Sequence, residues 1–511
     1  MKQVYFLTIT FFIFIISFSI TALATTSAEL YITMPYQLGD DLHKLRHILS
    51  LAKIKDNKIF AFIKPSRIKA LQQLGYQYTL LDNPSEIARP KMLSVLRSKN
   101  SKITKNYDIG NENEGEGEGE NRDEGIDENS IDNINTSNSV DGDFVPIAGY
   151  PTYSAYENFI KDLANKYPTL CRLSEFGKTP KGHTLYMLKI TESVNQNKDK
   201  PAILYSGAIH GNEVVGYVLM LNLADYLLSK YNSDSRVRTL LNNSEIWINP
   251  LFNPDGTYYR NNNTVSGSTR SNSNGVDLNR NFPDPKEGDH PDGSSWQPET
   301  LALMDFLKQK RFVMAADFHG GAELVNYPWD TYQELHPDDA WFRYISRAYV
   351  DYIHNTFPQS SYMKDEDNGI TNGYAWYEIN GGRQDYLNVN HHTKAVTIEV
   401  SSDFIPNANQ LSNFWQWNLN SLLTFAEQAS LGIRGKVTDA KTGAGIKATI
   451  EIPSYDDKGS WVESLPSTGN FYRPIIGGTY SIKVSAPGYE TKTISGISVQ
   501  NGEAKEVNIQ L

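Results

Sequence analysis

Residues 206–217 read SGAIHGNEVVGY, and two different periodicities meet in this stretch. Before it, the apolar run PAILYSGAI predicts a strand that is buried on both faces. After it, VVGYVLMLNLADYLLSK spaces its apolar residues by three and four, which predicts a helix over residues 214–230. A strand that leads directly into a helix is typical of a parallel α/β sheet, whose sites lie at the carboxyl ends of the strands. His210 and Glu213, in the connecting turn, are therefore two candidate metal ligands.

A catalytic metal site needs a third protein ligand. The segment VMAADFHGGAELVNYPWD (residues 313–330) is a second apolar strand that ends in His319 and two glycines, which let backbone approach closely. Because parallel strands end at the same edge of a sheet, His319 can meet His210 and Glu213. Two imidazoles and one carboxylate with an open fourth position form the ligand set of a catalytic zinc site.

Other histidines are weaker candidates, because they do not follow a strand end and a small-residue turn. They are His290 in DHPDG, the neighbours His391 and His392, and the pair His43 and His47, whose spacing of four predicts an exposed helix face.

The chain has 511 residues, which is too long for one hydrophobic core and predicts several domains. The segment MKQVYFLTITFFIFIISFSITALA has a basic start, an apolar stretch and a small-residue end. This pattern predicts a secretory signal peptide over residues 1–24 and an exported protein, with an uncleaved membrane anchor as the alternative. The single cysteine, Cys171, cannot form an internal disulfide, and we expect it to be a buried apolar side chain.

The net charge of −11 is concentrated in one segment. Residues 108–143 hold 13 Asp and Glu side chains against one Arg, so the rest of the chain sums to about +1. A run of Gly, Asn and Glu cannot bury apolar area, and it predicts a solvated acidic linker, residues 101–146. No basic patch indicates a nucleic-acid partner.

The chain has three candidate domains, and the linker separates the first of them from the other two. In residues 25–100, ELYITM, KIFAFI and YQYTLL predict strands while DDLHKLRHILSLA and PSRIKALQQLG predict helices, which together form a small α+β unit. This unit is either propeptide-like or an accessory module. Residues 147–431 hold long α/β material, and residues 432–511 are short strands separated by glycine turns, which predicts a small β-sandwich.

Several long motifs follow one another in a familiar order. HGNE, NPDG, DLNRNFPD, LVNYPWD, GITNGYAWYEINGGRQDY and TIEVSSD resemble the motifs of the zinc metallocarboxypeptidases, and closely those of the branch that contains carboxypeptidases N, E and D. The resemblance covers about residues 150–431, and the following β domain is similar to the transthyretin-like domain of that branch. It implies a mixed-sheet α/β catalytic domain, one zinc ion per chain, and hydrolysis of the C-terminal peptide bond of peptides or proteins.

The resemblance also implies roles for individual residues at the metal. His210, Glu213 and His319 match the zinc ligands. Asp277 in VDLNR matches the carboxylate that orients a ligand histidine. Glu399 in AVTIEVSSD matches the general base that takes a proton from the attacking water, and a Glu in a β-branched strand is otherwise costly to bury.

Further residues match those that bind the substrate. Asn279 and Arg280 match the pair that holds the free C-terminus, which suits the guanidinium fork. Arg270 matches the arginine that polarises the scissile carbonyl, with an exposed loop arginine as the alternative. Tyr377 in WYEINGG matches the tyrosine that covers the bound terminus, with surface packing as the alternative. Asn212 stands where the wider family has an arginine, as in the N, E and D branch.

Specificity rests on two further positions. Asp330, which closes NYPWD, matches an acid in the pocket for the C-terminal side chain, and Gln384 matches a polar residue at its base. A carboxylate there favours C-terminal Lys and Arg, whereas the alternative is that Asp330 caps a turn.

Three functional hypotheses follow from these residues. The first is an exported, monomeric carboxypeptidase without a stable membrane span. The second is another hydrolase of the same superfamily, such as a cell-wall peptide amidase or an amino-acid deacylase; Asn279, Arg280 and Tyr377 argue against the deacylase. The third is a non-catalytic binding protein, which we would expect to have lost a ligand or the base.

Overall fold

The structure is a computed structural model that describes residues 29–36, 42–87, 90–96 and 144–511. The signal peptide predicted for residues 1–24 lies outside the described residues, as does most of the acidic linker predicted for residues 101–146. Within the described ranges, no helix is both long and apolar enough to cross a membrane.

The N-terminal unit is a four-stranded sheet with two short helices, and its strand order is β2-β3-β1-β4. The prediction of one helix through DDLHKLRHILSLA is wrong in its second half: the helix ends at Arg46, and a strand begins at Leu49. Leu49 pairs with Ile63, and Leu51 with Ala61, so the alternating apolar residues complete the sheet instead of a helix face. The elements are β1 Leu30–Pro35, α1 Leu42–Arg46, β2 Leu49–Lys55, β3 Lys58–Ile63, η1 Pro65–Arg67, α2 Ile68–Gln73 and β4 Thr79–Leu81.

The central unit contains an eight-stranded mixed sheet in the order β13-β12-β14-β11-β9-β10-β8-β7. Its four central strands, β14, β11, β9 and β10, are parallel, and these strands carry almost wholly buried apolar side chains, as both-face burial requires. The strands are β7 Cys171–Lys178, β8 Thr184–Ile190, β9 Ala202–Gly207, β10 Glu245–Asn249, β11 Met314–His319, β12 Ala322–Tyr327, β13 Ile370–Asn372 and β14 Lys394–Ser401. A short parallel pair, β5 Met92–Leu93 and β6 Tyr150–Pro151, joins the N-terminal unit to this domain.

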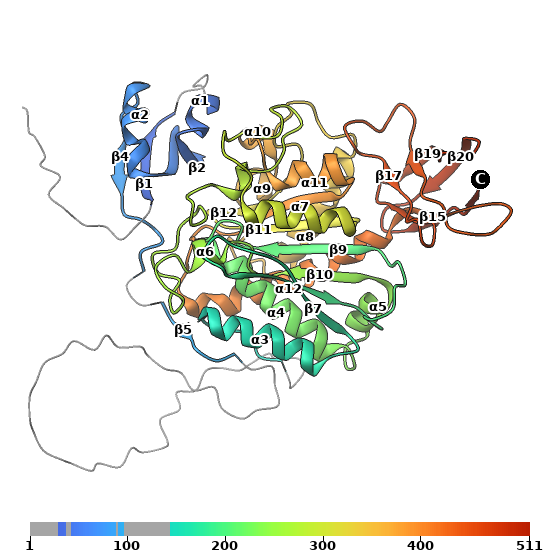
Figure 1. Ribbon diagram of the computed structural model, residues 1–511, viewed down its shortest axis with the longest axis horizontal. Coiled ribbons are helices and arrows are strands. Elements are labelled where there is room, and N and C mark those ends of the chain that lie inside the picture. The colour runs from blue at the N-terminus through green and yellow to red at the C-terminus, as the bar shows by residue number, and fades with distance from the viewer. Residues whose placement is uncertain (1–28, 37–41, 88–89, 97–143) are drawn as a thin grey trace, which may run out of the picture.

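Helices cover both faces of this sheet (Figure 1). One face packs against α3, α4, α5, α8 and α12, and the other packs against α7 and α11. The helices are α3 Tyr153–Lys166, α4 Val214–Lys230, α5 Ser235–Asn243, α6 Pro254–Thr257, η2 Leu278–Arg280, α7 Pro298–Gln309, α8 Asp339–Thr356, α9 Glu366–Gly369, α10 Gly373–Trp376, α11 Arg383–His391, η3 Ala408–Gln410, α12 Leu411–Glu427 and η4 Gln428–Ser430.

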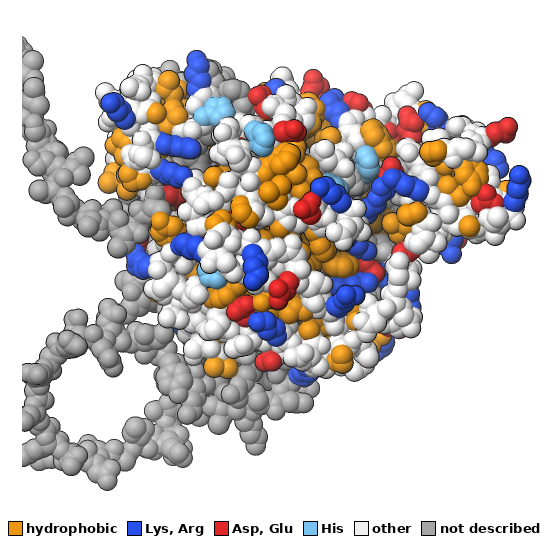
Figure 2. Space-filling view, in the orientation of Figure 1, with side chains coloured by type: hydrophobic (Ala, Val, Ile, Leu, Met, Phe, Trp, Pro, Cys, Tyr) orange, Lys and Arg blue, Asp and Glu red, His pale blue; other side chains and the backbone are white. Residues whose placement is uncertain are grey.

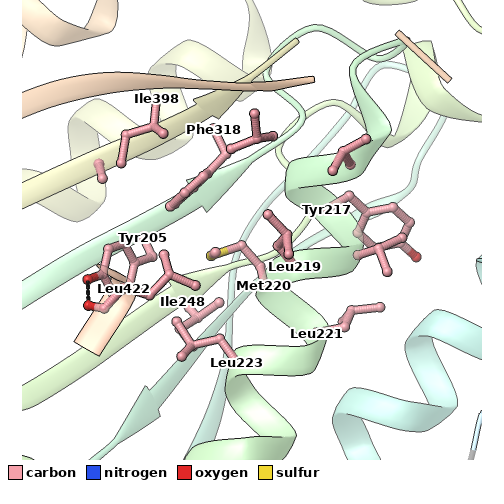
Figure 3. Close-up of a cluster of buried hydrophobic side chains, with 14 of the residues drawn as sticks. Tyr205, Tyr217, Leu219, Met220, Leu221, Leu223, Ile248, Phe318, Ile398 and Leu422 are labelled. Atoms are coloured by element: carbon pink, nitrogen blue, oxygen red, sulfur yellow. Dashed lines mark hydrogen bonds between the residues drawn. The ribbon is translucent and has the colours of Figure 1, made fainter. Parts of the chain in front are cut away.

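The helix α4 has the bounds predicted from its periodicity, and it is apolar nearly all round because it is buried. Figure 3 shows its side chains packed against those of β9, β10 and β11, where the Tyr205 hydroxyl donates to the Leu422 carbonyl at 2.7 Å. At Gly216 a Cβ atom would lie 2.4 Å from the Cβ of Phe318. A glycine is therefore required for the start of α4 to lie against β11, which brings Glu213 close to the end of that strand.

The C-terminal unit is the predicted β-sandwich, with two small sheets around one apolar core. A buried ion-pair network joins it to the central unit: Arg473 donates to Asp338 at 2.9 Å from both terminal nitrogens, and Lys394 pairs with the same carboxylate at 2.6 Å. The strands are β15 Gly432–Thr438, β16 Thr449–Glu451, β17 Val462–Glu463, β18 Asn470–Arg473, β19 Gly478–Ser485, β20 Lys492–Val499, β21 Ala504–Glu506 and β22 Ile509–Gln510.

Candidate metal and active site

The three predicted metal ligands meet at the carboxyl edge of the sheet. His319 is the last residue of β11, and His210 lies in the turn after the neighbouring strand β9. Glu213 immediately precedes α4. Their ligand atoms all lie within 4.8 Å of one another, and all three residues are buried. Among the described residues, no other group of His, Cys, Asp and Glu converges in this way.

The ring nitrogens have distinct partners. His210 Nε2 lies 3.0 Å from Asp277 Oδ1, and His319 Nε2 lies 3.3 Å from Asp317 Oδ2. A carboxylate beside Nε2 holds the proton on that nitrogen, so in the neutral imidazole the lone pair is on Nδ1. The two Nδ1 atoms lie 3.1 Å apart, and each lies 2.9 Å from one carboxylate oxygen of Glu213.

This arrangement fits a bound cation. When both imidazoles are neutral, two Nδ1 lone pairs and a carboxylate point at one buried position. Such a cluster is unfavourable in a protein interior unless a positive charge occupies its centre. Without a metal ion, burial acts to lower the pKa of His319, but the charges of Asp317 and Glu213 outweigh it and raise that pKa to about 10, so a proton takes the place of the cation. Two histidines and one carboxylate, each histidine oriented by an acid behind it, form the donor set of a catalytic zinc site.

Arg270 lies beside the ligand set and is 3% exposed. Its Nη1 donates to Glu213 Oε1 at 2.9 Å, and its Nε donates to Asp277 Oδ2 at 3.1 Å. It is therefore not the exposed loop arginine of the alternative reading. Burial acts to raise the pKa of Asp277, but the charges of Arg270 and His210 outweigh it and hold that pKa well below its ordinary value.

Glu399 lies on β14 directly opposite His319 on the neighbouring strand β11. It is 7% exposed, and its Oε2 atom is buried without a hydrogen-bond partner. Burial raises the pKa of Glu399 to about 8, with the charge of His319 acting against the shift and that of Glu213 adding to it. An unpartnered carboxylate oxygen beside the ligand set is well placed to accept a proton from a water there.

The residues expected to hold a peptide terminus line the same small cavity. Asn279 and Arg280 belong to the short helix η2, whose start is capped by Asp277, and Tyr377 lies across from them. All three are buried, with at most 9% of their surface exposed. The cavity that they share with the metal ligands and Glu399 measures about 10 Å³. That volume is roughly the space needed by one water molecule, so a peptide cannot enter this arrangement.

Asp330 and Gln384 lie next to each other behind this cavity. Gln384 Nε2 donates to Asp330 Oδ1 at 2.9 Å, and Asn326 Nδ2 donates to the same atom at 3.1 Å. The amide oxygens of Gln384 and Asn326 have no hydrogen-bond partner. Flipping either amide group would place its oxygen against the Asp330 carboxylate, which would repel it. Each amide therefore turns its N–H group toward Asp330 and leaves its oxygen without a donor. Asn326, which the sequence reasoning did not single out, lines the cavity itself.

The N-terminal unit closes the cleft from outside. Ala52 on β2 lines the catalytic cavity, and Ser50, two residues earlier on the same strand, contacts Arg270 and Asp277. The Glu29 carboxylate accepts the backbone N–H of Arg270 at 2.9 Å. These contacts cover the surface through which a substrate would reach the ligand set.

Apolar and polar contacts extend this docking beyond the cavity. Tyr377 and Ile379 belong to the same buried cluster as the core of the N-terminal sheet. Ser85 accepts from the Gly267 backbone at 2.7 Å through its carbonyl and from Asn212 Nδ2 at 3.2 Å through its hydroxyl. Asn212, at the position where the wider family has an arginine, thus contacts the N-terminal unit.

Two buried residues support the site without having been predicted. Asp317 lies two residues before His319 on β11 and pairs with Arg383, which is 1% exposed and also donates to Ser206 Oγ at 3.0 Å. The sequence does contain a signal for Asp317, because a residue two positions before the ligand His319 in a strand lies on the same face of the sheet. No sequence pattern around Arg383 indicates that it supports the site.

The other histidines considered as candidates lie elsewhere. His290 is exposed and contacts Trp296, and His47 is exposed beyond the end of α1. His391 and His392 come just before β14, at the opposite end of the strand from Glu399. The side chain of His43 lies outside the described residues. Cys171 is buried, as predicted, and burial raises the pKa of its thiol to about 12.

Two family profiles match the chain. The zinc carboxypeptidase family matches residues 156–421, and the carboxypeptidase regulatory-like domain matches residues 432–511. Human carboxypeptidase D is 37% identical over 370 residues, which are 70% of this chain and 26% of that protein. Mouse carboxypeptidase M is 33% identical over 362 residues (67% of this chain, 79% of that protein), and the mouse carboxypeptidase N catalytic chain is 32% identical over 380 residues (66% and 82%). The chain thus spans about a quarter of the length of the carboxypeptidase D relatives that it matches.

Solved structures show the same fold. Carboxypeptidase A from Helicoverpa armigera superposes with a TM-score of 0.56 at 17% sequence identity, covering 79% of this chain and 98% of that chain. Thrombin activatable fibrinolysis inhibitor superposes with a TM-score of 0.53 at 15% identity, covering 79% and 99%.

Proposed function

Because the chain belongs to the zinc carboxypeptidase family, we propose that it hydrolyses the C-terminal peptide bond of peptides or proteins and favours C-terminal Lys and Arg. One observation carries this proposal. The lone pairs of His210 and His319 and the carboxylate of Glu213 converge on one buried position, and the unpartnered Glu399 Oε2 lies beside it.

Each residue around this position has a separate chemical task. Zinc, when bound, acts as a Lewis acid that polarises the scissile carbonyl and acidifies a water molecule. Glu399 accepts a proton from the attacking water and then delivers it to the leaving amine. Arg270, once free of its contact with Glu213, donates to the developing oxyanion. Arg280 and Asn279 bind the free carboxylate of the substrate, and Tyr377 covers it.

The preference for basic side chains rests on the acceptors around Asp330. The Asp330 carboxylate accepts amide N–H groups from Asn326 and Gln384, and the two amide oxygens of these residues have no donor. A C-terminal guanidinium or ammonium group supplies those donors together with the opposite charge. An apolar side chain leaves the two amide oxygens unsatisfied and offers no opposite charge to Asp330, and an acidic one adds like charge, so both are disfavoured.

We also propose that residues 29–96 keep the enzyme latent until they are removed. The support is the contact of Ser50 with Arg270 and Asp277, together with the placement of Ala52 in a cavity of about 10 Å³. In this arrangement the Nε atom of Arg270 donates to Ser50, and the remaining cavity has room for about one water molecule, so no space is left for a peptide. Movement of the N-terminal unit is therefore required before a peptide can bind.

The signal-like segment MKQVYFLTITFFIFIISFSITALA supports export as part of the proposed function. A protease that acts on extracellular peptides also has a reason to remain latent until export is complete.

The proposal is tested with a panel of blocked dipeptides that differ only in the C-terminal residue. The chain should first be cleaved between residues 108 and 143, and each assay run with and without a chelator. We expect hydrolysis of Lys and Arg termini to exceed that of Leu, to stop on chelation and to return with zinc. Full activity in a metal-free preparation would contradict the mechanism. Turnover of cell-wall peptides without turnover of the panel would indicate an amidase instead.

A further inference from the structure

A second pocket lies where the catalytic domain meets the C-terminal β-sandwich, and its volume is about 560 Å³. We call it the junction pocket, and its charged walls include Lys189, Lys310, Arg311 and Glu245 on the catalytic side and Lys447 and Glu463 on the sandwich side. Figure 2 shows Lys and Arg side chains on the face of the molecule where these two domains join. A volume of roughly 300–1,000 Å³ is that of small-molecule sites, so this pocket is large enough for a ligand.

The junction pocket is separate from the active site. Val313, which lines it, immediately precedes β11, whereas His319 is the last residue of that strand. The six residues of β11 span about 20 Å at roughly 3.3 Å per residue. The two cavities therefore open at opposite ends of the parallel strands, and the peptide chemistry does not account for the junction pocket.

The lining is cationic. Seven Lys and Arg residues line the pocket together with three Asp and Glu residues. Two of the seven, Lys308 and Lys200, pair with Asp305 and Glu192 outside the lining, which leaves an excess of two positive charges in a chain whose net charge is −11. The two sides of the junction each hold a carboxylate that is shared by two cations. A concave surface lined by one sign of charge concentrates counter-ions, because its low-dielectric walls focus the field.

On the catalytic side, the shared carboxylate is Glu245, which is 1% exposed. Lys189 Nζ lies 2.7 Å from its Oε1, and Lys310 Nζ lies 2.5 Å from its Oε2. Both ammonium groups also lie over the ring of Trp247, at 5.6 and 5.3 Å from its centroid. One negative charge thus balances two positive ones, and the pair of ammonium groups retains donors for a second anion.

On the sandwich side, the shared carboxylate is Glu463. Arg311 of the catalytic domain pairs with it across the junction, and Lys447 lies 3.4 Å away. His391 and His392, which the metal site does not use, complete this wall. Arg311 presents a planar fork of donors, which matches the oxygen spacing of a phosphate or sulfate group.

We propose that the junction pocket binds a small molecule that carries two or more phosphate or sulfate groups, and that this ligand bridges the catalytic domain and the β-sandwich. The two cation pairs, one on each wall, require at least two oxyanion groups on the ligand. A ligand with a single oxyanion group would pair with the cations of only one wall. Because the ligand contacts both domains, its binding stabilises their junction.

The test uses the full chain, because both domains contribute to the pocket, and it does not depend on peptidase activity. Inorganic tripolyphosphate and sucrose octasulfate serve as the phosphate and sulfate probes in isothermal titration at low ionic strength, with inorganic phosphate as the comparison that carries a single oxyanion group. We expect saturable 1:1 binding of at least one multivalent probe and a rise in Tm at saturation. No saturable binding and no shift in Tm with either probe would overturn the proposal.

A matched pair of double variants separates a built site from general charge attraction. Arg311→Gln with Lys447→Gln should weaken binding at least about ten-fold, because charge-assisted contacts are lost on the ligand. Arg347→Gln with Lys483→Gln removes the same charge from two ion pairs outside the pocket, at 2.9 Å to Asp367 and 3.0 Å to Glu451, and should change binding less than about two-fold. Equal losses in both variants would overturn the site. If the first double variant does not fold, Lys447→Gln alone, whose side chain is 55% exposed, should still weaken binding measurably.

Discussion

Ser50 accepts a hydrogen bond from the Nε atom of Arg270 at 2.6 Å, although the two residues are 220 positions apart in the chain. The same hydroxyl group also donates to Asp277, the carboxylate that orients His210. A single side chain of the N-terminal unit therefore contacts both the arginine beside the metal ligands and the acid behind them.

Cleavage of the chain between residues 108 and 143 should release activity. Before cleavage the N-terminal unit remains tethered at high effective concentration, whereas after cleavage it is held by the docking contacts alone. We therefore expect the activity per molecule of the cleaved protein to rise on dilution, measured with a blocked dipeptide that ends in Arg. The uncleaved chain should show no such dependence on concentration. Full activity before cleavage would contradict the proposed latency.

Ser50→Ala should loosen the docking. It removes the hydrogen bond that the charged Arg270 donates to Ser50 and the one that Ser50 donates to the Asp277 carboxylate. Losing these charge-assisted bonds costs roughly 1.5–3 kcal/mol, or about ten-fold or more in the dissociation constant of the cleaved N-terminal unit. The measurement is the concentration at which the cleaved protein reaches half of its full activity. Thr33→Ala is the control, because the Thr33 hydroxyl bonds to Ile59 within the N-terminal sheet. Equal shifts in both variants would indicate a loss of folding in the unit.

Glu399→Gln should retain zinc and lose turnover. The amide keeps the shape of the side chain but cannot accept a proton, and loss of a general base lowers kcat by about 10²-fold or more. Metal content and kcat are measured on the same cleaved preparation. Glu378→Gln is the control, since Glu378 pairs with Lys286 at the rim of the site. Near wild-type turnover in Glu399→Gln would exclude Glu399 as the base.

Asp330→Asn should change substrate preference more than overall activity. Losing the carboxylate removes the charge partner of a bound Lys or Arg side chain, so kcat/KM for those termini should fall by about 10²-fold. A C-terminal Leu side chain carries no charge that could pair with Asp330, so kcat/KM for those substrates should change by only a few-fold. An equal loss on both substrates would assign Asp330 to the turn before Tyr332 instead of the pocket.

The preference for basic termini should depend on pH. Burial raises the pKa of Asp330 to about 6, against the hydrogen bond from Asn326 and the charge of Arg280. Asp330 is therefore ionised above about pH 6 and neutral below it, so the ratio of kcat/KM for Arg over Leu should fall as the pH is lowered through this value. The ratio cancels the ionisation of Glu399, which acts on both substrates. A ratio that stays constant between pH 5 and pH 8 would contradict this assignment.

Local patterns were sufficient where one element depends mainly on its own residues. The strand β9 and the helix α4 follow directly from their apolar spacing, and the turn between them carries His210 and Glu213 where the sequence places them. The helix predicted through DDLHKLRHILSLA ends at Arg46 because the apolar residues from Leu49 onward also fit a strand. Pairing of Leu49 with Ile63 on the neighbouring strand decided between the two.

The sequence by itself indicated that His210, Glu213 and His319 converge, and the resemblance of its motifs to a known family indicated Glu399 as the candidate base and the mixed sheet. The metal ligands are recognisable because the carboxyl ends of parallel strands meet at one edge of a sheet, so polar residues that follow those strands lie close together. Only the tertiary structure decided that Ser50 and Ala52 close the cleft, that Asn326 joins the pocket of Asp330, and that cations of two domains share one pocket. These contacts join surfaces from distant parts of the chain, and their complementarity leaves no periodic signal in either segment. Packing, and not local propensity, determines which surfaces meet.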